Sequence, residues 1–367
     1  MLEGIVQVAI YDATVAIEGG YRPFIASPTV TGPASTAAAV AKAACEVLLA
    51  RVPGQAANVA DRYDRYLAAI PDGPEKTNGI AVGGQVAEAI LAWRADDGLD
   101  NAVPYVQPPP GPGVFEPVFP GSTPVDVKLT QVRPLTLTSN DQFRPDGPSP
   151  LGSAEYAEDF NEVKAYGRAD STIRTPEQTD IARFWSDNSA VQWPRAVRAL
   201  ALDKGLDLAQ TARLLTLMHV AVADSILACF DAKYHYLFWR PIHAIPRAGT
   251  DGNPLTEPDS SWLPLLYPNH PNHPEYPGAH GCWTTAVTET MAAFFDTDKV
   301  AFTVQSTVPA VNQKTRHYQR FSDAAKEVYD ARTWAGLHFR NSSMEGAWIG
   351  RKVAHYVAAS FFRPTGP

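Results

Sequence analysis

The stretch Lys233-Tyr-His-Tyr-Leu-Phe-Trp-Arg240-Pro241 decides the fold, together with Pro277-Gly-Ala-His280 and Arg332-Thr-Trp-Ala-Gly-Leu-His338. These three separated blocks supply three cations and two imidazoles. Arginine offers a planar fork of donors to paired oxygens, and lysine supplies a compact charge. One imidazole can bond to phosphorus or a metal centre, and a second can move protons near neutral pH. We therefore expect the fold to gather the blocks around one small tetrahedral oxyanion.

The spacing of these residues resembles the motif shared by vanadium-dependent haloperoxidases and type 2 phosphatidic acid phosphatases. That motif reads K-x6-R-P, then P-S-G-H, then S-R-x5-H-x3-D. Here six residues separate Lys233 from Arg240, and Pro241 follows. Five residues separate Arg332 from His338. Order and spacing both agree with the family pattern.

Segments outside the motif are similar to the soluble, bacterial-type haloperoxidase-like branch of this superfamily. They are Tyr11-Asp-Ala, the run from Thr175 to Trp185, and Asn272-His-Pro-Glu-Tyr-Pro277. The likeness covers most of the chain and is densest over residues 175–350. It implies an all-α fold of helical bundles, with long proline-rich loops and little or no strand. Apolar periodicity predicts helices over residues 34–51, 78–93, 206–239, 281–295, 323–340 and 345–358.

The resemblance also implies roles for individual residues. His338 corresponds to the residue bonded to vanadium, or to the phosphorylated nucleophile of a phosphatase, and His280 to the acid–base histidine. His273 corresponds to a second histidine of bromoperoxidases, where chloroperoxidases carry an aromatic residue, so bromide or iodide is favoured. The predicted oxyanion-binding residues are Lys233, Arg240, Gly278, Ala279, His280, Arg332 and His338, and the predicted catalytic residues are His280, His338, Lys233 and His273. The implied cofactor is vanadate, and phosphate fits the same site; the implied partners are hydrogen peroxide, a halide and a small organic acceptor.

Two departures from the family pattern bear on the reaction. Gly278 and Ala279 replace the family's Ser-Gly, so a hydroxyl donor is missing, although the two backbone amides could donate instead. Ser342 stands where many phosphatases have an aspartate, and serine cannot raise the basicity of His338 as a carboxylate would. An acid phosphatase using a phosphohistidine is therefore the alternative enzyme. A non-catalytic protein that binds phosphate or vanadate is the alternative from another class.

The long segment that carries Lys233 invites two further predictions. A seven-residue step is close to two helical turns, so Lys233 and Arg240 should share a face. Without the motif, a solvated helix face would be the ordinary interpretation, but the neighbouring tyrosine, phenylalanine and tryptophan rings favour half-buried cations. Asp231 is a candidate partner for Arg332, with an exposed helical carboxylate as the equal alternative.

Composition narrows the classes of partner. The formal net charge is −8 and no basic run is present, which argues against nucleic acid. The three cysteines lie in apolar surroundings without C-x-x-C spacing and are predicted to be buried free thiols. We expect no apolar run of the length that spans a bilayer, and no signal peptide at the N-terminus. A soluble protein follows, and export and a homo-oligomer both stay open.

A proline-rich segment over residues 101–150 forbids helix and separates two regions. Phe115, Phe119 and Phe143 favour a wrapped, packed loop over a disordered linker. We therefore expect an N-terminal helical region over residues 1–150 that ends in this loop. A motif-bearing helical bundle over residues 151–367 follows it, and the two are expected to form one compact unit.

Overall fold

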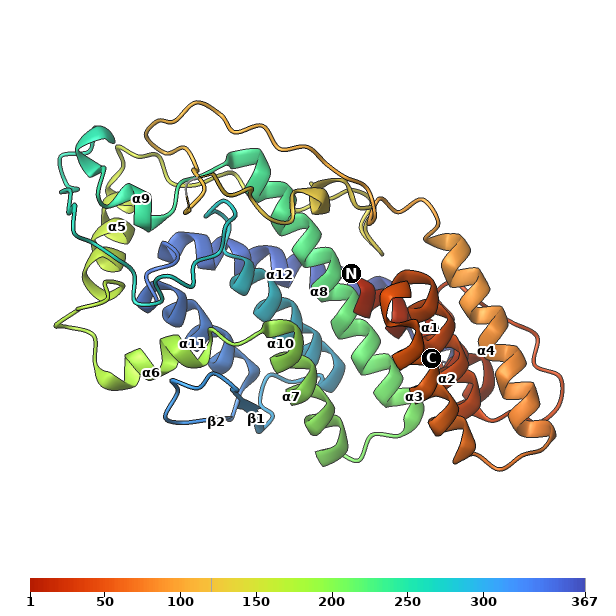
Figure 1. Ribbon diagram of the computed structural model, residues 1–367. Coiled ribbons are helices and arrows are strands. Elements are labelled where there is room, and N and C mark those ends of the chain that lie inside the picture. Colours follow the sequence, from red (N-terminus) through yellow and green to blue (C-terminus); the bar gives the residue numbers. More distant parts are fainter. Residues whose placement is uncertain (120, 367) are drawn as a thin grey trace. The chain divides into compact units, whose positions relative to one another are not determined.

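The computed structural model describes residues 1–119 and 121–366 (Figure 1). Their contacts divide the chain into two compact units. Unit 1 comprises Met1–Asp97, Arg198–Ala223 and His355–Pro367, and unit 2 comprises Gly98–Val197 and Asp224–Ala354. The boundary expected near residue 150 stays a prediction, because each of the two units contains segments from both sides of that position.

Unit 1 is helical. Its first four α-helices are α1 (Leu2–Glu18), α2 (Thr36–Arg51), α3 (Ala56–Ala68) and α4 (Pro74–Trp93), with the short 3-10 helix η1 (Pro53–Gln55) between α2 and α3 (Figure 1). The segment after α1 is held by Asp12, whose buried carboxylate accepts backbone N–H bonds from residues 24–26 at 2.7–2.9 Å. The motif Tyr11-Asp-Ala13 therefore serves the packing of this unit.

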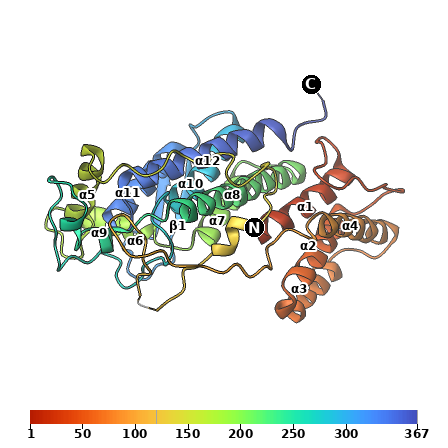
Figure 2. The same ribbon diagram turned by 90° about the horizontal axis from the view of Figure 1, so that it is seen from above.

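Unit 2 contains the three motif blocks. Its elements, including those that continue into unit 1, are η2 (Val127–Gln131), α5 (Ala154–Tyr166), α6 (Pro176–Phe184), α7 (Ser189–Asp203), α8 (Leu208–Tyr236), α9 (Pro241–Ala244), η3 (Ala248–Thr250), α10 (Ala279–Phe295), β1 (Phe302–Gln305), β2 (Thr315–Tyr318), α11 (Phe321–Trp334) and α12 (Arg340–Ser360). Figure 2 shows α8, α10 and α12 running alongside one another. The two strands form an antiparallel hairpin in which Phe302 faces Tyr318. The predicted all-α fold is confirmed, and the two-stranded hairpin is a small addition to the helices.

All six predicted helices are present, but several boundaries were wrong, among them the start of α12 at Arg340 rather than at residue 345. α8 ends at Tyr236 because Leu237 adopts a left-handed φ of 49°. Arg240 is the N-cap of α9, so Lys233 and Arg240 do not share one helical face. α11 ends at Trp334, short of the predicted end at residue 340, because the chain turns at Gly336 with a φ of 75°.

α6 begins at a well-formed cap, and one local prediction is confirmed. Thr175 caps α6 in a complete capping box, with Pro176 at the first helical position. The three cysteines are buried and free.

The proline-rich segment packs onto α8. Phe115 is fully buried, whereas Phe119 remains 39% exposed. Further along, the backbone N–H groups of Leu135 and Thr136 donate to the buried carboxylate of Asp224 at 2.6 and 2.7 Å. This carboxylate fixes the loop to the helix, because a buried charge is stable only where donors surround it.

α8 contains an 18-residue window that is apolar enough and long enough to cross a bilayer, with a mean hydropathy of 1.6, contrary to the expectation that no run approaches that length. In this structure, 83% of that apolar window is buried. The core helix of a compact bundle has the same property, so the pattern is weak evidence for a membrane span.

The core of unit 2 lies next to the motif blocks in sequence as well as in space. One buried cluster includes Trp239, Tyr276 and Phe339, packed with residues of α5 and α9. Each of these rings is the immediate neighbour of a candidate site residue or of Glu275. Packing of the rings therefore fixes the backbone from which the polar groups project.

α10 and α12 cross so closely that only glycine fits. A Cβ on Gly350 would lie 2.5 Å from the carbonyl oxygen of Cys282 and 2.8 Å from the amide nitrogen of Ala286. Both contacts are with backbone, so no side-chain rotation can relieve them. We expect Gly350→Ala to destabilise unit 2 by about 1–3 kcal/mol, measured as a lower midpoint of thermal or urea unfolding.

Gly84→Ala is the matched control for this substitution. It lies within α4, where the nearest atom to an added Cβ is Lys42 Cε at 4.0 Å. Alanine there should stabilise by about 0.5–1 kcal/mol, because it lowers the entropy of the unfolded chain. Equal effects of the two substitutions would contradict the close crossing of α10 and α12.

Candidate functional site

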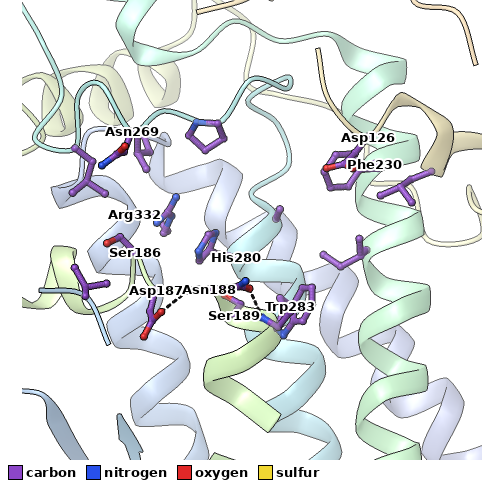
Figure 3. A pocket seen from close by; sticks show the side chains of 18 residues that line it. Asp126, Ser186, Asp187, Asn188, Ser189, Phe230, Asn269, His280, Trp283 and Arg332 are labelled. Carbon is purple, nitrogen blue, oxygen red and sulfur yellow. Dashed lines mark hydrogen bonds between the residues drawn. The ribbon is translucent and has the colours of Figure 1, made fainter. Parts of the chain in front are cut away.

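Unit 2 contains a cavity of about 640 Å³, shown in Figure 3. His280 and Ala279 at the start of α10 line it, with Arg332 from α11 and Leu337 from the turn after α11. The loop before α7 and the middle of α8 supply other parts of the wall. The second and third motif blocks therefore meet at one cavity.

Arg332 brings unused donors to this cavity. Its side chain is 2% exposed, and its one hydrogen bond runs from Nη1 to the carbonyl oxygen of Trp185 at 3.4 Å. Its Nε is buried and has no partner among the described residues. A guanidinium carries five N–H donors and stays protonated, so a buried one with most of its donors unused favours an anionic ligand. Trp185 is itself held by a bond from its Nε1 to Glu327 at 2.8 Å.

His280 lies in the first turn of α10, where backbone N–H groups have no partner within the helix. Burial lowers the pKa of its imidazole well below the usual value, and the nearby charges of Arg332, Lys233 and Arg240 lower it further. His280 is therefore neutral near pH 7. One ring nitrogen can then accept a proton and the other can donate one.

One of the two amides predicted to replace the missing hydroxyl is already in use. Gly278 donates its N–H to the carbonyl oxygen of Ser342 at 2.7 Å, so it is not available to a ligand. The N–H of Ala279, the first residue of α10, remains, and Ala279 lines the cavity.

Lys233 is fully buried and its ammonium group is saturated. Its three N–H bonds go to the carbonyl oxygens of Pro274, Glu275 and Pro277, the first two at 2.8 and 2.9 Å. Burial lowers the pKa of Lys233 to about 8. Lys233 therefore organises the segment before His280 and contributes its charge to the site. Direct bonding to a ligand, which the motif predicts, would require it to release one carbonyl.

Arg240 and His273 form a second buried pair. Arg240 donates from Nε to the His273 carbonyl oxygen at 2.7 Å, from Nη1 to the Leu337 carbonyl oxygen at 3.1 Å, and from Nη2 to His273 Nδ1 at 3.0 Å. His273 Nδ1 lies 3.0 Å from Arg240 Nη2, which can only donate, and 3.1 Å from the Pro274 carbonyl oxygen, which can only accept, so these contacts do not fix the tautomer of the ring. His273 thus orients Arg240, and it is not among the described residues that line the cavity.

A residue that the sequence analysis missed holds His338. His338 is 1% exposed, and its Nδ1 lies 2.9 Å from Oε1 of Glu275, which is fully buried. The same oxygen accepts the N–H of Phe339 at 3.0 Å, and Ser342 donates its hydroxyl to the other oxygen. The carboxylate fixes the proton on Nδ1 and leaves the Nε2 lone pair free, as metal-binding or nucleophilic histidines require.

Glu275 thus supplies the carboxylate that the sequence analysis found missing at position 342. The available signal was its place in Asn272-His-Pro-Glu-Tyr-Pro277, a segment noted only for its resemblance. Burial raises the pKa of Glu275 to about 7, although Ser342, Lys233 and Arg240 oppose this shift.

These groups leave the site with a surplus of positive charge. Lys233, Arg240 and Arg332 are buried cations, and Glu275 is the buried carboxylate beside them. Three positive charges and one negative charge leave about two positive charges, since burial and the cations keep the histidines neutral. A small oxyanion with one or two negative charges would offset this surplus.

The proposed pair of Asp231 with Arg332 was wrong. Asp231 accepts two bonds from Arg144, from Nε at 2.7 Å and from Nη2 at 3.0 Å. The proline-rich loop brings Arg144 to α8, where its guanidinium forms a bidentate pair that uses both oxygens of the Asp231 carboxylate. Arg332 is therefore left without a carboxylate partner among the described residues.

The fold and part of the sequence are similar to known proteins. Residues 213–365 match the family model described as the VCPO second helical-bundle domain. The fold is similar to the structure of the first bacterial vanadium-dependent iodoperoxidase, with a TM-score of 0.84 and 23% identity over 100% of this chain and 91% of that chain. It is also similar to the holo and apo structures of a bacterial vanadium-dependent chloroperoxidase, with TM-scores of 0.77 and 0.76. Both are 15% identical over 98% of this chain and cover 90% and 92% of theirs. No curated protein sequence matches the chain.

The buried charge of Lys233 predicts a pH dependence of anion binding. Sulfate serves as the probe because its own charge is constant near neutral pH. Lys233 is charged below its pKa of about 8 and loses its proton above it, and Glu275, with a pKa of about 7, gains its negative charge over the same range, so affinity should fall as pH rises from 7 to 9. We expect sulfate to bind roughly tenfold more weakly at pH 9 than at pH 7, measured by isothermal titration calorimetry.

An exposed lysine on α11 provides the control for this experiment. Lys326→Met removes a charge far more accessible to solvent and should leave the pH profile unchanged. A wild-type affinity that stays constant across this range would contradict a titrating Lys233 beside the anion.

Proposed function

We propose that this protein, whose residues 213–365 belong to the second helical-bundle domain family of the vanadium-dependent haloperoxidases, oxidises halides with hydrogen peroxide at a bound vanadate. The observation that supports this most is the geometry of His338. Its Nδ1 is held by Glu275 and its Nε2 has no partner among the described residues, next to three buried cations of which Glu275 balances only one charge.

The site residues fit vanadate by charge and by donor chemistry. Nε2 of His338 would be the ligand to vanadium, and Arg332, with Arg240, would donate to its oxygens. Lys233 would add charge, and the N–H of Ala279 would stand in for the family's serine hydroxyl. When bound, vanadate acts as a Lewis acid that activates peroxide toward a halide without changing its own oxidation state.

His280 is the proposed acid–base group. It is neutral, lines the cavity, and makes no hydrogen bond to another described side chain. It can accept a proton from hydrogen peroxide as the peroxide binds, and return it to the oxygen that leaves as water. Nearby cations keep its pKa low, so the ring releases the proton readily.

We propose bromide or iodide as the halide. His273 stands where chloroperoxidases carry an aromatic ring, and it is bonded to Arg240. A relative with the same fold is an iodoperoxidase, and another is a chloroperoxidase. Bromide and iodide are also more readily oxidised than chloride.

An acid phosphatase remains the second candidate, and one observation favours it. The absence of an aspartate after His338 argues against a phosphatase, but Glu275 supplies a carboxylate to that imidazole. With its Nδ1 held, His338 could attack phosphorus through Nε2 while His280 protonates the leaving oxygen.

Parallel assays distinguish the two functions. We expect vanadate-loaded protein to oxidise iodide to triiodide with hydrogen peroxide, and His338→Ala to lose at least a hundredfold of that rate. Vanadate-free protein should not hydrolyse a phosphomonoester. Phosphomonoester hydrolysis that vanadate inhibits, without any halide oxidation, would instead establish the phosphatase.

Glu275→Gln should separate two kinds of anion binding. The glutamine oxygen can still accept from His338 Nδ1 and Phe339 N–H, but its charge is gone, so Nε2 becomes less basic. Vanadate, bonded to that nitrogen, should bind roughly 10–100-fold more weakly. Phosphate, held by charge alone, should bind as well or better, because the site gains a net positive charge. Calorimetry measures both affinities.

Ser342→Ala is the milder companion to this substitution. It removes one donor from Glu275 but keeps the carboxylate, so vanadate affinity should fall less than in Glu275→Gln. Equal losses of vanadate and phosphate affinity in Glu275→Gln would show a general disruption of the pocket and contradict the assigned role.

A further inference from the structure

Two of the three free cysteines meet where α8 contacts α10. Cys229 lies on α8 and Cys282 on α10, and both side chains are fully buried. Their thiols interact with each other. The third cysteine, Cys45, lies on α2 in unit 1. Unit 2 therefore contains a buried dithiol that has no part in the proposed reaction.

Two hydrogen bonds hold the helices together at this contact. Ser225 donates its hydroxyl to the carbonyl oxygen of Cys282 at 3.1 Å. One turn further along α8, Cys229 donates its thiol to the carbonyl oxygen of Pro277 at 3.7 Å. Because residues four apart share a face of a helix, one face of α8 contacts both Cys282 and the segment just before α10. Helix packing therefore brings the two thiols together.

The dithiol lies next to the wall of the cavity of about 640 Å³. Phe230 follows Cys229 in the chain, and Trp283 follows Cys282, and both of these rings line the cavity (Figure 3). The cysteines themselves are not among the described residues of the lining, so they lie behind it. Hydrogen peroxide is neutral and close to water in size, and local opening of the wall would admit it to the thiols.

The two thiols differ in their readiness to ionise. Lys233 lies one turn after Cys229, and both donate to the carbonyl oxygen of Pro277. Burial opposes ionisation of Cys229, but the contact with Cys282 and the charge of Lys233 together outweigh burial and lower the pKa of the Cys229 thiol. Burial and the same contact raise the pKa of Cys282 well above its usual value. Since the thiolate is the nucleophile, Cys229 is suited to attack and Cys282 to resolve the product.

We propose that Cys229 and Cys282 form a dithiol that hydrogen peroxide oxidises reversibly to a disulfide between α8 and α10, and that this reaction protects the oxyanion site from irreversible oxidation. The reaction needs neither vanadate nor a halide, so it does not rest on the proposed function. That function supplies the reason why peroxide would reach these thiols.

The reaction balances with hydrogen peroxide as its only reagent. The Cys229 sulfur forms a bond to one peroxide oxygen as the oxygen–oxygen bond breaks, and the departing hydroxide takes the thiol proton to form water. This leaves a sulfenic acid at Cys229. The Cys282 sulfur then forms the disulfide bond as the sulfur–oxygen bond breaks, and the second hydroxide leaves as water with the Cys282 proton. Two thiols are oxidised, and one peroxide is reduced to two waters.

Closing the disulfide matters for the oxyanion site because of the charge on Lys233. Without a second thiol, the sulfenic acid at Cys229 would react with more peroxide to give a sulfinic acid, which thiol reductants do not restore. A sulfinate there would place a fixed negative charge beside Lys233 and offset part of the positive charge available to the anion. A disulfide is neutral and can be reduced. Cys282 therefore keeps oxidation of Cys229 reversible.

The first test maps the disulfide in the full-length wild-type protein, without vanadate or halide. After treatment with hydrogen peroxide, the remaining thiols are alkylated under denaturing conditions and the peptides are identified by mass spectrometry. We expect one pair of peptides linked through Cys229 and Cys282, with Cys45 alkylated. Dithiothreitol should restore both thiols. Cys45→Ala is the matched control and should give the same linked pair.

The second test removes the resolving thiol. Cys282→Ala does this without burying a new hydroxyl group. Dimedone should trap a sulfenic acid at Cys229 in this variant, and excess peroxide should convert it to the sulfinic acid. After excess peroxide and then dithiothreitol, the variant should bind sulfate roughly tenfold more weakly than before, whereas the wild type and Cys45→Ala should recover. Sulfate binding before peroxide verifies that each protein is folded.

Each outcome supports or overturns the inference, and the mapping in the wild type needs no variant. Thiols at Cys229 and Cys282 that stay free in peroxide, or a disulfide that includes Cys45, would overturn it. Full recovery of sulfate affinity in Cys282→Ala would overturn the protective role. Disulfide formation in a protein that oxidises no halide would support the dithiol and reject the haloperoxidase. Halide oxidation by a protein whose thiols stay free would reject this inference alone.

Discussion

The site depends on the short segment from His273 to Gly278, which binds groups from three other parts of unit 2. Its backbone carbonyls accept every N–H of Lys233 and one N–H of Arg240. The Glu275 side chain accepts from His338, Phe339 and Ser342. One stretch of chain therefore aligns two cations and a histidine through hydrogen bonds, and these bonds use every N–H of the Lys233 ammonium group. Side chains held in this way lose little freedom when a ligand arrives.

The surplus of buried positive charge destabilises the unliganded site, and the same surplus makes the site selective for anions. Burial lowers the pKa of Lys233 and of both arginines, which shows that the charged forms are destabilised where they stand. A bound anion offsets this cost, and part of the electrostatic strain is then recovered as binding energy. Cations paired in advance with carboxylates would bind anions more weakly.

The sequence predicted which cations and histidines meet, because fixed spacings within three blocks define that set. It did not predict how they are held. Glu275 lies 63 residues before His338, so no local period connects them. The turn at Leu237 also escaped detection, because leucine gives no signal for a left-handed conformation. Propensity and periodicity describe single elements, whereas these contacts arise from tertiary packing.

Two departures from the family motif, Gly278 and Ser342, are linked by the packing of the start of α10 against α12. Gly278 donates its N–H to the Ser342 carbonyl oxygen, and a Cβ at position 278 would lie 3.1 Å from that oxygen and 3.2 Å from Ser343 Cα. A serine there would push the start of α12 away by a few tenths of an ångström. The same close approach brings the Ser342 hydroxyl to Glu275. Glycine at 278 and serine at 342 are thus compatible with each other, because the small residue just before α10 allows the short side chain on α12 to reach the carboxylate that orients His338.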